Sequence, residues 1–245
     1  MCREQQLTLQ QSFARALGWL LLASMIMASI TSYADIVVDK VYKPNILPFE
    51  RDVEWRLVSR KTDTGNELFH RVGYGHAFTE GFMVEVFLSA ERDELENVSL
   101  AEYEVEARWM LGEQGQYWAD TAFIFEIEKS HKVDHFKTSI GLINEKQFGR
   151  THLATNLIVK YVFGQAIDSV LESEFRMQYR YRLRPAFQPA LELYTDKDFF
   201  GIGPGFMGVK KFSPQQQLKW ELAFIKGFNG DSKDHTLRAG LQWSF

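Results

Sequence analysis

The sequence predicts an all-β protein: a single transmembrane, antiparallel, up-and-down β-barrel of about 12 strands that follows a cleaved signal peptide. Three observations support this prediction. An apolar run near the N-terminus ends in small residues, apolar and polar side chains then alternate through most of the chain, and the last stretch, 235–245, alternates strictly and ends on Phe245. Because successive side chains of a strand point to opposite faces, alternation indicates strands with one apolar and one polar face.

The N-terminal region has the three parts of a secretory signal peptide. Arg3 and Arg15 flank a polar start, 16–30 carries no charge, and small residues precede a cleavage position after Ala34. The apolar run is shorter than the ~20 residues that a spanning helix needs. We therefore expect a signal peptide at 1–34, with an N-terminal membrane anchor as the alternative.

Composition narrows the possible functions of the remaining chain. Removing Arg3, Arg15 and Glu4 leaves 26 basic and 31 acidic residues, so the mature net charge is 26 − 31 = −5. This mild acidity argues against a nucleic-acid partner, which would require a basic surface. The single cysteine, Cys2, lies in the predicted signal peptide, so we expect neither disulfides nor thiolate metal sites in the mature protein.

An irregular lead-in, 35–48, is broken by Pro44 and Pro48 and is expected to lie either in the periplasm or in the lumen. The barrel is expected over 49–245. The first six strands are expected at 50–59, 67–78, 82–90, 100–111, 117–129 and 135–144, where apolar pairs such as Val53/Trp55, Leu68/Val72, Val84/Val86, Val105/Trp109, Phe123/Phe125 and Ile140/Leu142 share one parity. Turn-forming residues such as 62–66 and 79–81 separate them.

The last six strands are expected at 151–164, 169–183, 187–194, 203–212, 217–228 and 235–245. The alternation is clearest in 169–183 and weakest in 187–194 and 203–212, which contain Pro189 and Pro204. Connections after strands 2, 4, 6, 8 and 10 are expected to be short and those after 3, 9 and 11 longer. Short periplasmic turns and longer outer loops are typical of transmembrane barrels.

The predicted strands suit a membrane better than a soluble core. Most carry four or five consecutive apolar, often aromatic positions on one parity and charges on the other. A soluble sandwich or a lipocalin-like barrel also alternates and remains the alternative. In lipid, a closed barrel is the only β-structure that satisfies every backbone group.

The signal peptide, the alternating body and the terminal strand together resemble Gram-negative outer-membrane β-barrels. The resemblance covers nearly the whole chain and implies a location in the outer membrane, surrounded by lipid and lipopolysaccharide. It also implies that the barrel-assembly machinery reads a signal formed by Leu241, Trp243 and Phe245. Twelve-stranded members include acidic-oligosaccharide channels, a nucleoside channel and an outer-membrane phospholipase, so the fold alone does not choose a function.

Charged residues on the inward parity are expected to line the lumen. An acidic wall and a basic strip would create a transverse field for a polar or charged solute; the alternative is that these charges only pair with one another, as we expect for Arg108 and Asp120. The predicted lining comprises Glu85, Glu102, Glu104, Glu106, Arg108, Asp120, Glu126, Glu128, Lys160, Glu172, Glu174, Arg176, Arg180 and Arg182.

No local pattern in the sequence predicts catalysis, a metal site or a cofactor. The six histidines are scattered, and none stands in a Ser/His arrangement of the phospholipase kind. The sequence therefore favours a small passive channel or solute-uptake barrel with a charged lumen. The alternatives are a lipid-modifying hydrolase whose site assembles from separate strands, and a non-conducting structural or adhesion barrel that acts through loops such as 91–99 and 195–202.

Overall fold

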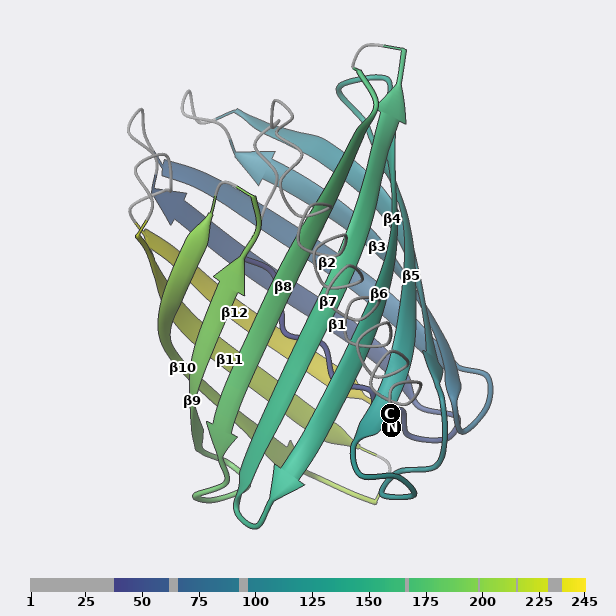
Figure 1. Ribbon diagram of the computed structural model, residues 1–245, viewed down its shortest axis with the longest axis vertical. Helices are drawn as coiled ribbons and strands as arrows, with labels where there is room; N and C mark the ends of the chain where they lie inside the picture. The colour runs from purple at the N-terminus through teal and green to yellow at the C-terminus, as the bar shows by residue number, and fades with distance from the viewer. Residues whose placement is uncertain are drawn as a thin grey trace, which may run out of the picture. The chain divides into compact units, whose positions relative to one another are not determined.

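The computed structural model describes residues 38–61, 66–92, 97–165, 168–197, 199–214, 216–228 and 235–245, and the predicted signal peptide lies outside these residues. Within them, 12 antiparallel strands form one closed barrel in which each strand pairs with its sequence neighbours (Figure 1). The strands are β1 (Arg51–Lys61), β2 (Asn66–Ala77), β3 (Phe82–Arg92), β4 (Val98–Met110), β5 (Asp120–Ser130), β6 (His135–Phe148), β7 (Thr151–Gly164), β8 (Val170–Tyr181), β9 (Gln188–Thr195), β10 (Phe200–Lys211), β11 (Gln217–Gly227) and β12 (His235–Ser244). The predicted fold class is confirmed.

The last strand closes the ring against the first. Val53 lies opposite Trp243 and Trp55 opposite Leu241, and the ladder continues to Lys61 opposite His235. Backbone hydrogen bonds between Arg51 and Phe245 extend the pairing past the end of β12. This end of the barrel, which holds Arg51 and Phe245, is called the terminal end below, and the opposite end is called the distal end.

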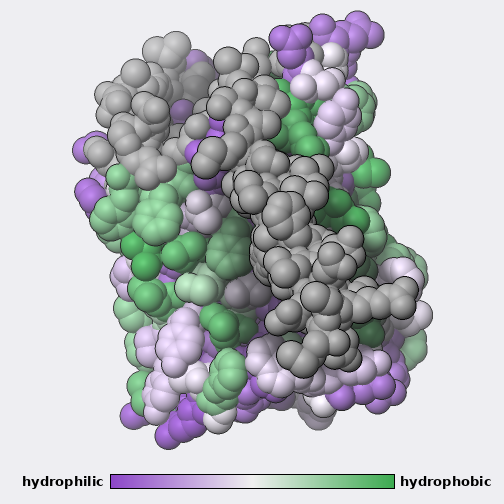
Figure 2. Space-filling model, viewed as in Figure 1, coloured by the Kyte–Doolittle hydropathy of each residue, from purple (hydrophilic) through white to green (hydrophobic). Residues whose placement is uncertain are grey.

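The apolar parity of the strands faces outward. Large apolar residues such as Val72, Val105 and Leu157 are about half exposed, whereas the opposite parity buries charged residues. Figure 2 shows apolar residues gathered at mid-height of the visible face, with hydrophilic residues towards both ends. A soluble protein rarely exposes so extensive an apolar band, whereas a barrel in lipid requires one. In the described residues, no helix is long and apolar enough to cross a membrane.

Two expectations about the connections are wrong. Arg108 lies opposite Ile124 rather than Asp120, because β4 ends at Met110 and β5 begins at Asp120, so that 111–119 is a long connection and not a tight turn. That connection stands at the terminal end, where short turns were expected. At the distal end, 196–199 is short, because the residues from Phe200 onward, expected to be loop, join β10 instead.

Residues 38–48, the described part of the lead-in, lie inside the barrel (Figure 1). We call them the inner segment. The chain reverses between Leu47 and Glu50, where the Glu50 amide donates to the Leu47 carbonyl (3.1 Å) and Phe49 takes a φ of 58°. After the reversal β1 runs antiparallel to the segment, so that Lys40 meets Glu54.

The inner segment packs against opposite walls of the barrel. On one side, Tyr42 and Ile46 join apolar inward residues of β2–β6, among them Ile124 and Ile143. On the other side, Val38 and Val41 join a second apolar cluster from β7, β9, β11 and the β9–β10 connection. The interior is therefore apolar where these apolar side chains of the segment pack, which explains why Ile124 and Ile143 stand on the otherwise polar parity.

Candidate functional site in the barrel lumen

Two arginines project into the lumen from the middle of their strands, each held by a glutamate two residues earlier on the same face. Arg56 on β1 donates from Nε to Glu54 (2.9 Å), and Arg176 on β8 donates to both carboxylate oxygens of Glu174. Both arginines are almost fully buried. A guanidinium has five donors in a planar fork, so one edge can bind the wall glutamate while the other edge remains available towards the axis.

Two further arginines complete the group from other strands. Arg238 on β12 is 0% exposed and donates bidentately to Glu192 on β9, at 3.0 Å to each oxygen. Arg71 on β2 pairs with Glu104 on β4 and lies 4.3 Å from the ring centroid of Phe87. We call Arg56, Arg71, Arg176 and Arg238 the arginine cluster.

Phe87 turns into the lumen because its neighbour on β2 is a glycine. A Cβ on Gly73 would lie 2.3 Å from the Phe87 ring, so any larger residue would displace the ring. The ring in turn supports the Arg71 guanidinium through a cation–π contact. Gly73 therefore helps to position one member of the arginine cluster.

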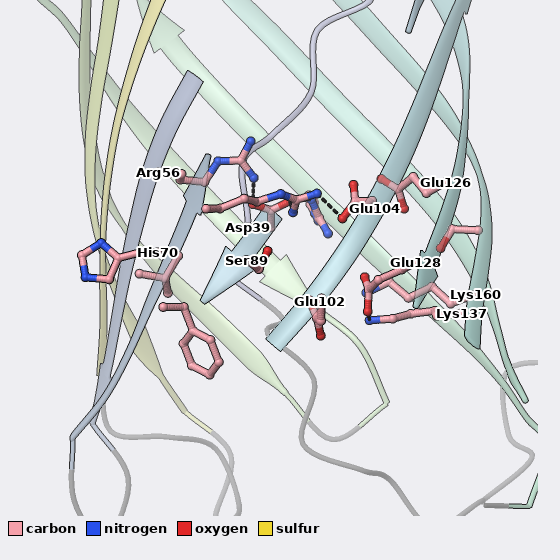
Figure 3. Close-up of a pocket in the computed structure, with 15 residues that line it drawn as sticks. Asp39, Arg56, His70, Ser89, Glu102, Glu104, Glu126, Glu128, Lys137 and Lys160 are labelled. Atoms are coloured by element: carbon pink, nitrogen blue, oxygen red, sulfur yellow. Dashed lines mark hydrogen bonds and ion pairs between the residues drawn. The ribbon is translucent and has the colours of Figure 1, made fainter. Parts of the chain in front are cut away.

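Asp39 of the inner segment occupies the point on which the arginine cluster converges. Its carboxylate accepts a hydrogen bond from Nη1 of Arg56 (Figure 3). It also accepts one from Nη1 of Arg176 (3.3 Å), and Nη1 of Arg71 lies 3.7 Å away. Nη1 of Arg238 donates to the Asp39 backbone carbonyl. Burial alone would raise the pKa of Asp39, but the guanidinium groups of Arg56, Arg71 and Arg176 outweigh burial and hold the pKa well below its usual range.

Further polar contacts fix the backbone of the inner segment. The Tyr42 amide donates to Asn156 Oδ1 (2.7 Å), and Asn156 Nδ2 donates back to the Tyr42 carbonyl (3.0 Å). Arg176 donates to the Lys40 carbonyl (2.8 Å) and Arg108 to the Lys43 carbonyl (3.1 Å). These hydrogen bonds fasten the backbone of the inner segment to side chains of the barrel wall.

Glutamates of β3, β4 and β5 lie next to one another in the sheet. Glu85, Glu106 and Glu126 lie in register across the three strands, and Glu104 lies opposite Glu128. Like charges in register are unfavourable unless cations intervene. Arg108 pairs with Glu85 and lies 3.7 Å from Glu106, Arg71 pairs with Glu104, and Lys137 pairs with Glu128 (2.9 Å).

Three of these carboxylates come close enough to share a cation. Oxygens of Glu104, Glu106 and Glu126 lie within 4.8 Å of one another, and Figure 3 shows the Glu104 and Glu126 side chains side by side. Such oxygens suit a hard cation such as Ca²⁺. However, Arg71 and Arg108 already supply positive charge to two of the three carboxylates.

Most of the predicted lining residues do turn inward. Glu85, Glu104, Glu106, Arg108, Lys160, Glu174 and Arg176 are buried, and Glu102, Glu126, Glu128, Glu172 and Arg180 are half-buried. Two predicted residues stand elsewhere. Asp120 begins β5 and accepts a hydrogen bond from the Gly115 amide (2.6 Å) in the long connection, and Arg182 lies past the end of β8, exposed and bonded to His152 (2.7 Å). Each is displaced because its strand is shorter than the alternation indicated.

The predicted basic strip on β8 is not a separate wall. Arg176 and Lys160 are both paired with Glu174, and Arg180 is paired with Glu145 (2.8 Å). Positive and negative groups therefore alternate around the lumen, and a transverse field between two opposed walls is not supported.

Several lumenal residues were absent from the predicted lining. Asp39 and Lys40 lie in the lead-in, which shows no periodicity, so no pattern could place them. Arg56 and Arg71 stand on the inward parity of their strands, but parity does not show that they form a group. Glu192 and Arg238 are isolated charges on short strands, and only the ring closure that brings β12 and β9 to the same interior could have paired them.

Two cavities lie along the lumen and share no lining residue. The first is lined by Asp39, most of the arginine cluster, and charged residues of β4 to β8. The second is the larger and is lined by Lys40 to Lys43 and by residues nearer the terminal end, such as Glu145 and Arg180. The inner segment thus contributes to both cavities and stands between them.

Neither His70 nor His152 has a hydroxyl nucleophile as a hydrogen-bond partner among the described residues. His70 is turned away from the other labelled residues in Figure 3 and neighbours Trp55 on the outer face, with ring centroids 6.2 Å apart. His152 Nδ1 lies 3.2 Å from Glu145, which resembles the base and orienting group of a catalytic triad. Its other nitrogen contacts Arg182 instead of a hydroxyl nucleophile.

No family model matches the sequence, and no curated protein matches it. Solved structures do match the fold. An outer membrane channel from Pseudomonas putida F1 is 11% identical, with a TM-score of 0.60 over 85% of this chain and 100% of that one. The KdgM porin in complex with disordered oligogalacturonate is 14% identical, with a TM-score of 0.53 over 79% and 99%. The β domain of the Bordetella autotransporter BrkA is 9% identical, with a TM-score of 0.51 over 80% and 98%. The fold of the chain is that of outer-membrane β-barrels, and it resembles small porins and channels.

Proposed function

We propose that the protein is a small passive channel for polar or charged solutes across the outer membrane. The observation that carries this proposal is the pair of cavities, each lined in part by charged residues, that follow one another along the lumen. A barrel that was only a membrane anchor could fill its interior with apolar side chains. This interior instead surrounds open space with charged groups, which can replace the hydration of a passing solute.

The inner segment makes the described state a closed or narrow one. Its backbone crosses the lumen between the cavities and contacts opposite walls. We therefore expect low conductance at rest, with brief larger openings when the segment moves. The KdgM porin is described with oligogalacturonate, which makes acidic sugars a reasonable first solute class to test here.

Planar-bilayer recording of the purified protein tests this function. We expect discrete conductance steps, and we expect them to grow larger and more frequent in the Asn156→Ala variant, which lacks the side chain that binds the Tyr42 backbone. Asn144→Ala is a matched control, because Asn144 bonds to Thr121 (2.9 Å) and does not touch the segment. Absence of conductance in all three proteins would refute the channel.

A structural, non-conducting barrel is the second candidate. The dense ion pairing around Asp39 and the two apolar clusters favour it, because both fill the interior. It predicts that loosening the segment lowers stability without producing conductance, which the same recordings distinguish.

A further inference from the structure

We propose that the arginine cluster is a carboxylate-binding site that Asp39 occupies in the absence of solute, and that a solute bearing a carboxylate binds there in its place. This proposal rests on the channel function and names the class of solute. It begins from the fact that the occupant of the cluster is itself a carboxylate, contributed by a segment that is not part of the barrel wall.

The guanidinium groups are positioned independently of Asp39. Arg56 and Arg176 use Nε and Nη2 for the glutamates on their own strands, and Arg238 uses Nη2 for Glu192. In all three, Nη1 is the nitrogen that reaches Asp39. Because the wall glutamates hold the other edge of each fork, the Nη1 atoms of Arg56 and Arg176 would remain near the position of the carboxylate if the Asp39 side chain left.

The geometry suits a carboxylate better than an isolated halide. Asp39 Oδ1 accepts from Arg56, and Oδ2 accepts from Arg176 with Arg71 close by, so the two oxygens have different partners. Arg238 supplies a further donor to the adjoining carbonyl. Planar, two-oxygen recognition by several guanidinium groups is how proteins distinguish carboxylates from spherical anions.

The first cavity borders the arginine cluster on its distal side. Asp39, Arg56, Arg71 and Arg176 all line the first cavity, whereas Arg238 and the rest of the inner segment do not. A solute in that cavity therefore meets the Asp39 side of the segment. Lys137 and Lys160 line the same cavity and are paired with Glu128 and Glu174.

Calorimetric titration of the purified full-length protein with galacturonate tests the site, and galactose, the same sugar without a carboxylate, is the matched probe. Asp39→Asn removes the competing charge, so we expect galacturonate affinity to rise by about tenfold or more, the effect of freeing at least one charge-assisted hydrogen bond. Galactose affinity should not change. Asp52→Asn is the control, because Asp52 is a buried lumenal aspartate that bonds to Gln242 (2.7 Å) and not to the cluster.

A second variant ties the effect to the arginines. Adding Arg71→Gln to Asp39→Asn should abolish the gain, while the heat-modifiable gel shift confirms that the barrel is folded. Equal galacturonate affinity in Asp39→Asn and Asp52→Asn would overturn the site, whatever the conductance. Selective galacturonate binding by a protein that never conducts would instead overturn the channel and leave the site standing.

Discussion

Replacing Asn156 by alanine should release the inner segment without opening the barrel. Asn156 is fully buried and satisfies both the amide and the carbonyl of Tyr42, so its loss leaves two buried backbone groups without partners. Each such group costs about 1–3 kcal/mol, which weakens docking of the segment by about 2–6 kcal/mol. The population of undocked segment should therefore rise by about thirtyfold at the lower end of this range.

Maleimide labelling of a cysteine at position 41 measures that population. Val41 is 4% exposed, and Cys2 is the single native cysteine, so Val41→Cys in a Cys2→Ser background gives one buried thiol. When docking is fast relative to labelling, the labelling rate follows the undocked fraction. Asn144→Ala in the same background should label at the parent rate. An increase of less than about threefold in Asn156→Ala would refute the view that these two hydrogen bonds hold the segment.

Three further predictions concern charge, stability and assembly. Burial, together with the nearby Arg180, lowers the pKa of Lys43 from 10.5 to about 8, so charged Lys43 opposes docking of the inner segment below pH 8, and this cost falls as the pH rises from 8 towards 10.5. Lys43→Met should therefore slow labelling of Val41→Cys at pH 7 and have no effect on it at pH 10.5. The same ratio of labelling rates, variant to parent, at both pH values would contradict a role for the Lys43 charge in docking. Arg238→Met should lower the free energy of unfolding in urea by about 3–5 kcal/mol, because it leaves the charge of Glu192 buried and unpaired. The double variant Arg238→Met with Glu192→Leu should lose less stability than Arg238→Met alone. If the stability losses of the two single variants simply add in the double variant, the pair is not coupled. Phe245→Ala should reduce the amount of protein in the outer membrane but leave the unfolding midpoint of the refolded protein unchanged, because the exposed side chain contributes little packing. A variant that reaches the outer membrane in the parent amount would contradict the prediction that Phe245 is part of the assembly signal.

The strands could be predicted because lipid on one side and polar groups on the other impose a period of two. That constraint is local, so even β10, with Pro204 and several glycines, could be placed near its observed position. Registers could not be predicted equally well, because they depend on where each strand ends. The predicted pairing of Arg108 with Asp120 assumes a tight turn between the two strands. Because the connection 111–119 is long, Ile124 lies opposite Arg108 instead.

The site could be predicted only in part, because its centre does not lie on a strand. The inward glutamates and Arg176 follow from parity alone. Asp39 owes its position to tertiary contacts with Arg56, Arg71 and Arg176, which come from three separate strands. A one-dimensional pattern indicates which side of the sheet a residue faces, but not which residues meet across the interior.

The reversal between Leu47 and Glu50 has a consequence for the order of events during biogenesis. The inner segment contacts Glu54 on β1, Asn156 on β7 and Arg238 on β12. These three strands enclose one common lumen only after β1 and β12 have paired. An open sheet can supply some of these partners but not all of them. The N-terminal end of the barrel region, although synthesised first, therefore reaches its full set of contacts only after the ring has closed.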